Sequence, residues 1–125
     1  MAEDDLETIL EEDDLETILD RVKKLLEEED WEHAAYQEVE AAKAAGRAKN
    51  LVKAAELYEQ AVEHFMKVWD YGMASKYSEQ AAKLNLATKN PTKAKELFLQ
   101  AAEYYGFIRE DKLQKSCLDR AAKLE

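Results

Sequence analysis

The stretch KNLVKAAELYEQAVE at residues 49–63 returns as KNPTKAKELFLQAAE at residues 89–103, 40 positions further along the chain. Nine of the fifteen residues are identical in the two copies. An internal repeat of this length is typical of arrays of helical hairpins, in which each repeat packs on the next. The repeat therefore predicts an all-α array, and arrays of this kind usually bind other molecules.

Candidate helix starts recur every 20 residues, which is half the repeat length. Short polar side chains, which cap the free amides of a first helical turn, recur at this interval as Asp30, Asn50, Asp70 and Asn90. We expect helices at about 14–29, 31–45, 51–69, 72–88, 91–105 and 110–124. Gly46, Gly72 and Gly106 lie at or near the turns, where glycine can take a left-handed conformation.

Alanines follow each cap at fixed distances and predict the packed face of each helix. They are Ala34, Ala54, Ala74 and Ala94, and seven positions later Ala41, Ala61, Ala81 and Ala101. A spacing of seven keeps two residues on nearly the same helix face. Small side chains on facing stripes let helix axes approach closely, with aromatic and aliphatic neighbours filling the space between.

These patterns predict a single helical-repeat domain over residues 14–125 behind an acidic extension of residues 1–13. About six helices form antiparallel hairpins, with repeat units at 31–70 and 71–110 and flanking helices at 14–29 and 110–124. A chain of 125 residues is long enough for a core without disulfides or metal. Three glycines and one proline are too few for a β protein.

Charge is distributed unevenly along the chain. Residues 1–30 hold fourteen acids against three bases, whereas the remainder holds fourteen acids and fifteen bases. The acidic segment repels phosphates and no basic surplus exists elsewhere, so nucleic acid is not an expected partner. No apolar run is long enough for a membrane span. The single cysteine, Cys117, fits a reducing compartment, and we expect a cytoplasmic protein.

A second, shorter duplication lies at the N-terminus, where DDLETIL occurs at residues 4–10 and again at 13–19. On a continuous helix, an offset of nine positions turns the two copies half a turn apart. The second copy continues into an apolar helix face, but the first, with Leu6, Ile9 and Leu10, does not. Either the chain breaks between the copies, or this patch offers an apolar face to something else, or the duplication is engineered or accidental.

The repeat also resembles a known family. Ala54, Tyr58 and Ala61, and again Ala94, Phe98 and Ala101, look like the second-helix signature of tetratricopeptide (TPR) repeats. The period of 40 and the phrase LYEQAVEHF at 57–65 are closer to the soluble NSF-attachment-protein type. The resemblance covers about residues 31–124. It implies a short right-handed solenoid with a groove lined mainly by first helices, and an adaptor or chaperone-like role.

No catalytic or metal-binding motif stands out. His33 and His64 lack the spacing that places two metal ligands on one helix face. Cys117 aligns with leucine and tyrosine in the other helices and is expected to be a buried apolar residue. Glycine-rich phosphate loops and nucleophile motifs are missing from the sequence. We therefore expect no enzyme activity, no cofactor and no metal, with the carboxylates on solvated positions or caps.

Lysines at equivalent repeat positions are the candidate contact residues: Lys43, Lys49, Lys53, Lys83, Lys89 and Lys93. Equivalent positions stack in an array, so these lysines should gather at one end of the helices. They could serve only to complement helix dipoles, or to pair with Glu56 and Glu96. Alternatively they attract an acidic partner, and the DDLETIL segment with Leu6, Ile9 and Leu10 is one candidate for that partner.

The sequence thus favours a non-catalytic, TPR-like interaction module that presents a helical groove to a peptide or protein with acidic character. The alternative is a structural bundle that assembles with copies of itself, a homo-oligomer joined through the duplicated acidic segment.

Overall fold

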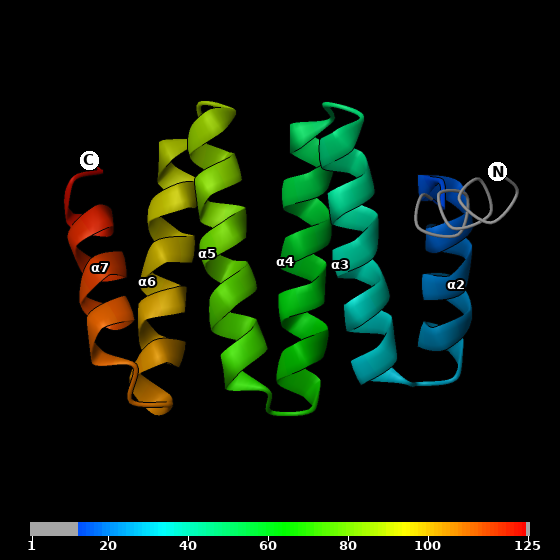
Figure 1. Cartoon of the computed structure of the whole chain (residues 1–125). Coiled ribbons are helices and arrows are strands. Elements are labelled where there is room, and N and C mark those ends of the chain that lie inside the picture. The colour runs from blue at the N-terminus through cyan, green and yellow to red at the C-terminus, as the bar shows by residue number, and fades with distance from the viewer. Residues whose placement is uncertain (1–12, 125) are drawn as a thin grey trace, which may run out of the picture.

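Six antiparallel helices stand side by side in the computed structural model, which describes residues 13–124 (Figure 1). They are α2 (Leu15–Glu27), α3 (Trp31–Arg47), α4 (Leu51–Lys67), α5 (Tyr71–Ala87), α6 (Pro91–Phe107) and α7 (Asp111–Ala122). Each helix packs mainly on its neighbours in sequence, and the described residues hold no strand. The predicted all-α array of stacked hairpins is confirmed. Among these helices, none has the length and apolar character needed to cross a membrane.

The polar residues predicted to begin the helices do so. Their side chains accept hydrogen bonds from backbone amides three positions on: Asp30 from His33, Asn50 from Lys53, Asp70 from Met73 and Asn90 from Lys93. The first described helix, α2, begins in the same way at Asp14, whose side chain accepts from the amide of Thr17. Pro91 occupies the first position of α6, where a missing N–H is harmless. Only α7, among the described helices, begins without a side-chain cap, at Glu110.

One turn geometry joins every pair of helices. In the turn after α3, Lys49 donates to the carbonyl of Gly46 and Asn50 donates to that of Ala45, both at 2.9 Å. This pair of bonds is the Schellman motif, which satisfies the last carbonyls of a helix. Asn50 then caps α4 with its side chain, so a single residue closes one helix and opens the next.

The left-handed residues of these turns are not the three glycines. Positive φ angles, between 56° and 66°, occur at Glu29, Lys49, Trp69, Lys89 and Arg109. Gly46 and Gly106 instead lie inside the last turns of α3 and α6, and Gly72 is the second residue of α5. The glycines do not take this conformation because they lie within the helices, and the constant spacing of the helix starts sets the position of the turn.

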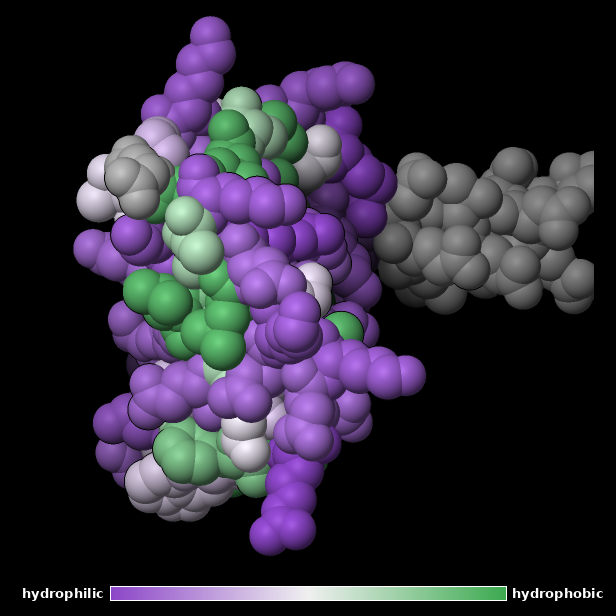
Figure 2. Space-filling model, turned by 90° about the vertical axis from the view of Figure 1, so that its left-hand side faces the viewer, coloured by the Kyte–Doolittle hydropathy of each residue, from purple (hydrophilic) through white to green (hydrophobic). Residues whose placement is uncertain are grey.

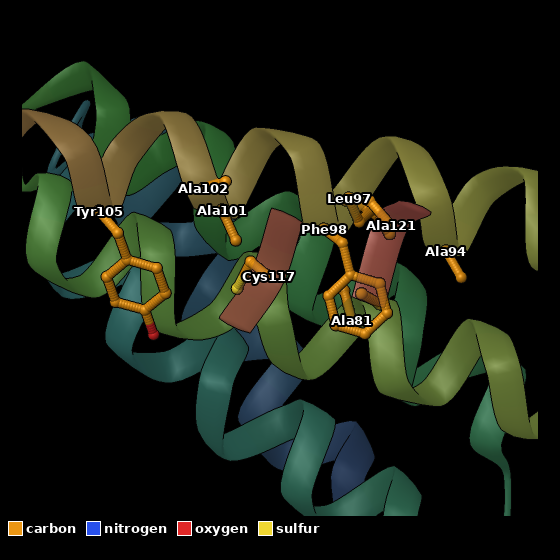
Figure 3. Close-up of a cluster of buried hydrophobic side chains, with 10 residues drawn as sticks. Ala81, Ala94, Leu97, Phe98, Ala101, Ala102, Tyr105, Cys117 and Ala121 are labelled. Carbon is orange, nitrogen blue, oxygen red and sulfur yellow. The ribbon is translucent and has the colours of Figure 1, made fainter. Parts of the chain in front are cut away.

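The core is the predicted alanine face with larger side chains between the layers. Alanines at the cap-plus-four and cap-plus-eleven positions are at most 1% exposed. In the cluster between α5, α6 and α7, Phe98 lies close to Ala81 and Ala121, while Cys117 of α7 lies beneath Ala101 (Figure 3). Cys117 is buried, as its repeat position predicted.

Candidate interaction surfaces

The six lysines named above as candidate contact residues all lie toward one end of the helices. The turns α3–α4 and α5–α6 are at this end, and α2 begins and α7 finishes there (Figure 1). Lys43 and Lys83 belong to the last turns before these two connections, Lys49 and Lys89 to the connections themselves, and Lys53 and Lys93 to the first turns that follow. We refer to this end as the lysine end.

Ion pairs divide the lysines into two groups. Lys43 and Lys83 pair along their own helices with Glu40 and Glu79, at 3.6 and 3.5 Å. Lys93 does not pair with Glu96 but crosses to Glu59 of α4, at 3.1 Å. The hydrogen bond and the charge of Glu59 raise the pKa of Lys93.

The remaining three lysines are free to meet other charges. Within the part of the chain that the structure describes, Lys49, Lys53 and Lys89 have no carboxylate oxygen within 4.0 Å. Lys49 and Lys89 are also exposed. These lysines therefore contribute unneutralised positive charge at the lysine end.

Two adjoining clefts run between α4 and α6, which are the second helices of the two repeat units. Both are lined by Glu59 and Lys93, whose ion pair lies between them. Their other lining residues include Glu56, Glu63 and Glu96. Carboxylates outnumber cations here, so this face of the array is acidic.

A depression on the first-helix side has the opposite character. It lies between α3 and α5 over α4 and is lined by Ala42, Lys43, Gly46, Arg47, Ala54, Tyr58, Gln80 and Leu84. Lys43 and Arg47 are exposed, whereas Tyr58 is half-buried and stacks on Tyr77 with ring centroids 5.5 Å apart. No carboxylate is among the lining residues. We call it the α3–α5 depression.

A buried acid–histidine pair lies deeper in the array. Glu38 of α3 is fully buried, and its Oε1 is 2.6 Å from Nδ1 of His64 on α4. Trp31 stacks on the His64 ring, with centroids 5.6 Å apart. Burial raises the pKa of Glu38, and the hydrogen bond from His64 opposes that rise.

Sequence reasoning missed this pair. We expected carboxylates only on solvated positions or caps, and Glu38 contradicts that expectation. The signal was available, because Glu38 shares its position in the helix-and-turn unit with Tyr58 and Phe98, both inward-facing. The other histidine, His33, contacts its own helix cap, Asp30, at 2.9 Å. Residues 13–124 contain no group of three or more side chains placed to hold a metal ion.

Leu6, Ile9 and Leu10, the apolar residues proposed to contact a partner, lie outside the described residues.

The comparisons with known proteins give one match. Residues 18–125 match the family described as soluble NSF attachment protein, SNAP. The chain belongs to the SNAP family. Its TPR-like repeat and its family were thus both visible in the period of 40 and in the alanine–aromatic signature. No curated protein and no solved structure matches the chain. Membership of the SNAP family suggests a helical adaptor that acts through protein–protein interaction, a type of protein that is not catalytic.

Proposed function

We propose that this SNAP-family chain is a non-catalytic adaptor that holds an acidic, partly apolar segment of another protein in the α3–α5 depression. The supporting observation is the composition of its lining, with an apolar floor, two cations at the rim and no carboxylate. Apolar floors supply affinity, and the few charges at the rim select the partner and speed its approach.

The geometry suits a side chain inserted between the two helices. Ala42, Gly46 and Ala54 leave room above the floor, and the stacked rings of Tyr58 and Tyr77 make that floor rigid. A leucine of the partner would contact Leu84 and Tyr58, while a neighbouring carboxylate reaches Lys43 or Arg47. Arginine forms the stronger contact, since its guanidinium binds a carboxylate through two parallel hydrogen bonds.

The other predicted lysines would act at longer range. Lys49, Lys83 and Lys89 share the lysine end with the depression and attract an approaching acidic segment. Lys93 belongs to the opposite, acidic face, because it lies in the α4–α6 clefts beside Glu59. Lys53 lies in the first turn of α4, the helix that also carries Glu59. We therefore place Lys43 and Arg47 at the contact itself.

Nuclear magnetic resonance with an acidic amphipathic probe tests the proposal. A short peptide of repeated Glu-Glu-Leu-Leu units is titrated into isotope-labelled protein. We expect the amide signals of Lys43, Gly46, Arg47 and Leu84 to shift together. The double variant Lys43→Glu/Arg47→Glu should weaken binding at least about tenfold, which corresponds to ~1.4 kcal/mol.

The matched control is Lys23→Glu/Arg109→Glu, which changes the net charge by the same amount at exposed sites outside the depression. It should bind the peptide with nearly unchanged affinity. Equal weakening in both double variants, or shifts confined to the α4–α6 clefts, would show that the depression is not the site.

A further inference from the structure

The first helices α3 and α5 each bury one particular face under the helix that follows. In α3 this face consists of Ala35, Glu38 and Ala42, and in α5 of Ser75, Ser78 and Ala82, all of them 0% exposed. Glu38 contacts His64 of the following helix α4, and Ser78 contacts Gln100 of the following helix α6. One full repeat later, the same register falls on Lys115, Leu118 and Ala122 of α7.

On α7 this face is open. All three residues are exposed, and Leu118 presents 45% of its surface. None of the described helices covers it, because α7 packs on α6 and α5 through the residues of its other face, Cys117 and Ala121. Figure 2 views the molecule from the side of α7 and shows hydrophobic groups interrupting an otherwise hydrophilic surface. Within the described residues, α7 therefore leaves exposed the face that α3 and α5 bury.

The helix at the opposite edge is different. The outward residues of α2 are polar: Glu16, Thr17, Asp20, Lys23 and Lys24. Terminal units of repeat arrays need such a polar outer face for solubility. Of the two edge helices in the described part of the chain, α2 has a polar outer face, whereas the outer face of α7 carries the exposed Leu118 among polar residues.

The open side of α7 is also basic. A shallow depression is lined by Lys112, Lys115, Ser116, Asp119, Arg120 and Lys123. Its one acid, Asp119, pairs weakly with Lys115 at 3.4 Å. An occupant that complements this surface carries negative charge together with an apolar stripe. A helix of that kind presents its stripe to Leu118 and Ala122.

The chain contains one segment with both properties. Residues 1–12, MAEDDLETILEE, include six acids and no lysine or arginine. Leu6, Ile9 and Leu10 recur at a spacing of three and four, which places side chains on one helix face. Asp4 and Glu7 fit the first and fourth positions of a helix start. This first DDLETIL copy has no apolar continuation of its own.

The length of the connection to α2 decides whether residues 4–10 can contact α7 of their own molecule or only α7 of another. Only residues 11 and 12 separate residues 4–10 from Asp13, and the three Cα–Cα steps from residue 10 to residue 13 span at most about 11 Å. Four helices lie between α2 and α7 (Figure 1), and adjacent helix axes are ~8–10 Å apart. A helical segment of residues 4–10 therefore cannot reach α7 of its own molecule.

We propose that residues 4–10 of one copy pack as a short helix on the Lys115–Leu118–Ala122 face of α7 in a second copy. The contact is heterologous and head-to-tail, so each molecule offers one donor segment and one acceptor face. A symmetric α7–α7 contact is disfavoured, since it would set four cations of one copy against the same four of the other. The small, charged interface makes the association weak and sensitive to salt.

Sedimentation velocity of the full chain from 10 µM to 1 mM, in about 50 mM and about 500 mM salt, measures this association. We expect the weight-average mass to rise with concentration at low salt and to fall back toward the monomer at high salt. Leu118→Asp removes the acceptor face, and Leu6→Asp/Ile9→Asp removes the donor segment. Each variant should stay monomeric. Leu99→Asp is the control, because Leu99 is equally exposed, at 44%, on α6.

Mixing the two inactive variants gives the sharper result. Leu6→Asp/Ile9→Asp keeps the acceptor face on α7, and Leu118→Asp keeps the donor segment. The mixture should therefore form a one-to-one dimer and nothing larger. Circular dichroism checks that both variants remain folded. The proposal is overturned if the wild-type chain stays monomeric at 1 mM, if either variant associates like wild type, or if the mixture stays monomeric.

Discussion

Glu38 and His64 join α3 to α4 through a hydrogen bond of 2.6 Å inside the core. The carboxyl group has no exposed surface, and its second oxygen, Oε2, has no hydrogen-bond partner within residues 13–124. Burial raises the pKa of Glu38 above its ordinary value of 4.5, His64 acts against that rise, and Glu63 adds to it. The folded protein therefore holds a proton on Glu38 more tightly than the unfolded chain does.

This difference predicts a pH dependence of stability that Glu38→Gln should remove. A group with a raised folded pKa contributes stability that is complete below its unfolded pKa and is lost as pH rises through the folded pKa. From pH 7 to pH 5 the wild-type protein should gain free energy of unfolding relative to Glu38→Gln. Urea denaturation at pH 5, 6 and 7 measures the gain.

His64→Gln is the companion variant and should act in the opposite direction. Without the imidazole, nothing lowers the pKa of Glu38, so the stability falls more steeply toward pH 7 than in the wild-type protein. Parallel curves for all three proteins would mean that Glu38 does not titrate differently on folding.

Lys49→Gly should stabilise the protein. Lys49 has φ 66°, and a side chain in this left-handed region costs ~1–2 kcal/mol. Glycine avoids that cost but loses more entropy on folding, about 0.5–1 kcal/mol, which leaves a gain of roughly 1 kcal/mol in the free energy of unfolding. The same substitution at Lys53, inside α4, should lose a similar amount. A loss at both positions, measured in urea, would contradict the turn geometry.

Gly46→Ala should also stabilise, for a different reason. Gly46 lies within α3, and a Cβ built on it meets nothing within 4 Å. Alanine is the better helix former by roughly 0.5–1 kcal/mol. Gly106→Ala is the comparison, because its Cβ would lie 2.5 Å from the side-chain nitrogen of Gln114. The melting temperature should rise more for Gly46→Ala than for Gly106→Ala, and the reverse order would argue against these helix ends.

Ala61→Leu should destabilise the array by about 1–3 kcal/mol through overpacking, since Ala61 is 0% exposed in the cluster between α3, α4 and α5. Ala87→Leu adds the same atoms at an exposed position at the end of α5. That control should change the free energy of unfolding little. Equal losses from the two variants would refute the alanine stripe as the packed face.

Cys117 should react with thiol reagents only when the protein opens. The thiol is buried, and burial, with the charge of Glu79, raises its pKa to about 11. At pH 7 only about one thiol in ten thousand is ionised, and the thiolate is the reactive form. We expect iodoacetamide to modify Cys117 slowly in native buffer and rapidly in urea. Equally fast modification in native buffer would place Cys117 at the surface.

The fold was predictable because its determinants are local and periodic. Asn50 and Asn90 indicate helix starts by their side-chain chemistry, and Ala61 and Ala101 indicate a packed face by their spacing. The left-handed turn residues were not predictable in this way. Such a residue is usually glycine, whereas in this array the left-handed positions are held by Lys49 and Lys89. Local preference was overridden by the constant length of the helix-and-turn unit.

The candidate surfaces were less predictable, because contacts between helices depend on their packing. The repeat spacing predicted that the lysines lie at one end of the helices. It could not predict that Lys93 forms an ion pair with Glu59 on the neighbouring second helix, α4. Nor could it separate the basic α3–α5 depression from the acidic α4–α6 clefts, since both draw on neighbouring residues of the same repeat. The Glu38–His64 pair spans 26 positions and follows no motif.

The uniform turn has a consequence for how such a chain can grow. A 17-residue helix and a three-residue connection make a constant unit, and two units restore the starting orientation. Copying any block of two units therefore reproduces the surface on which the next block stacks, and lengthening by tandem duplication requires no new interface. The nine-residue duplication at 4–10 and 13–19 is not a multiple of that unit. Its period is therefore unrelated to the one that builds the array.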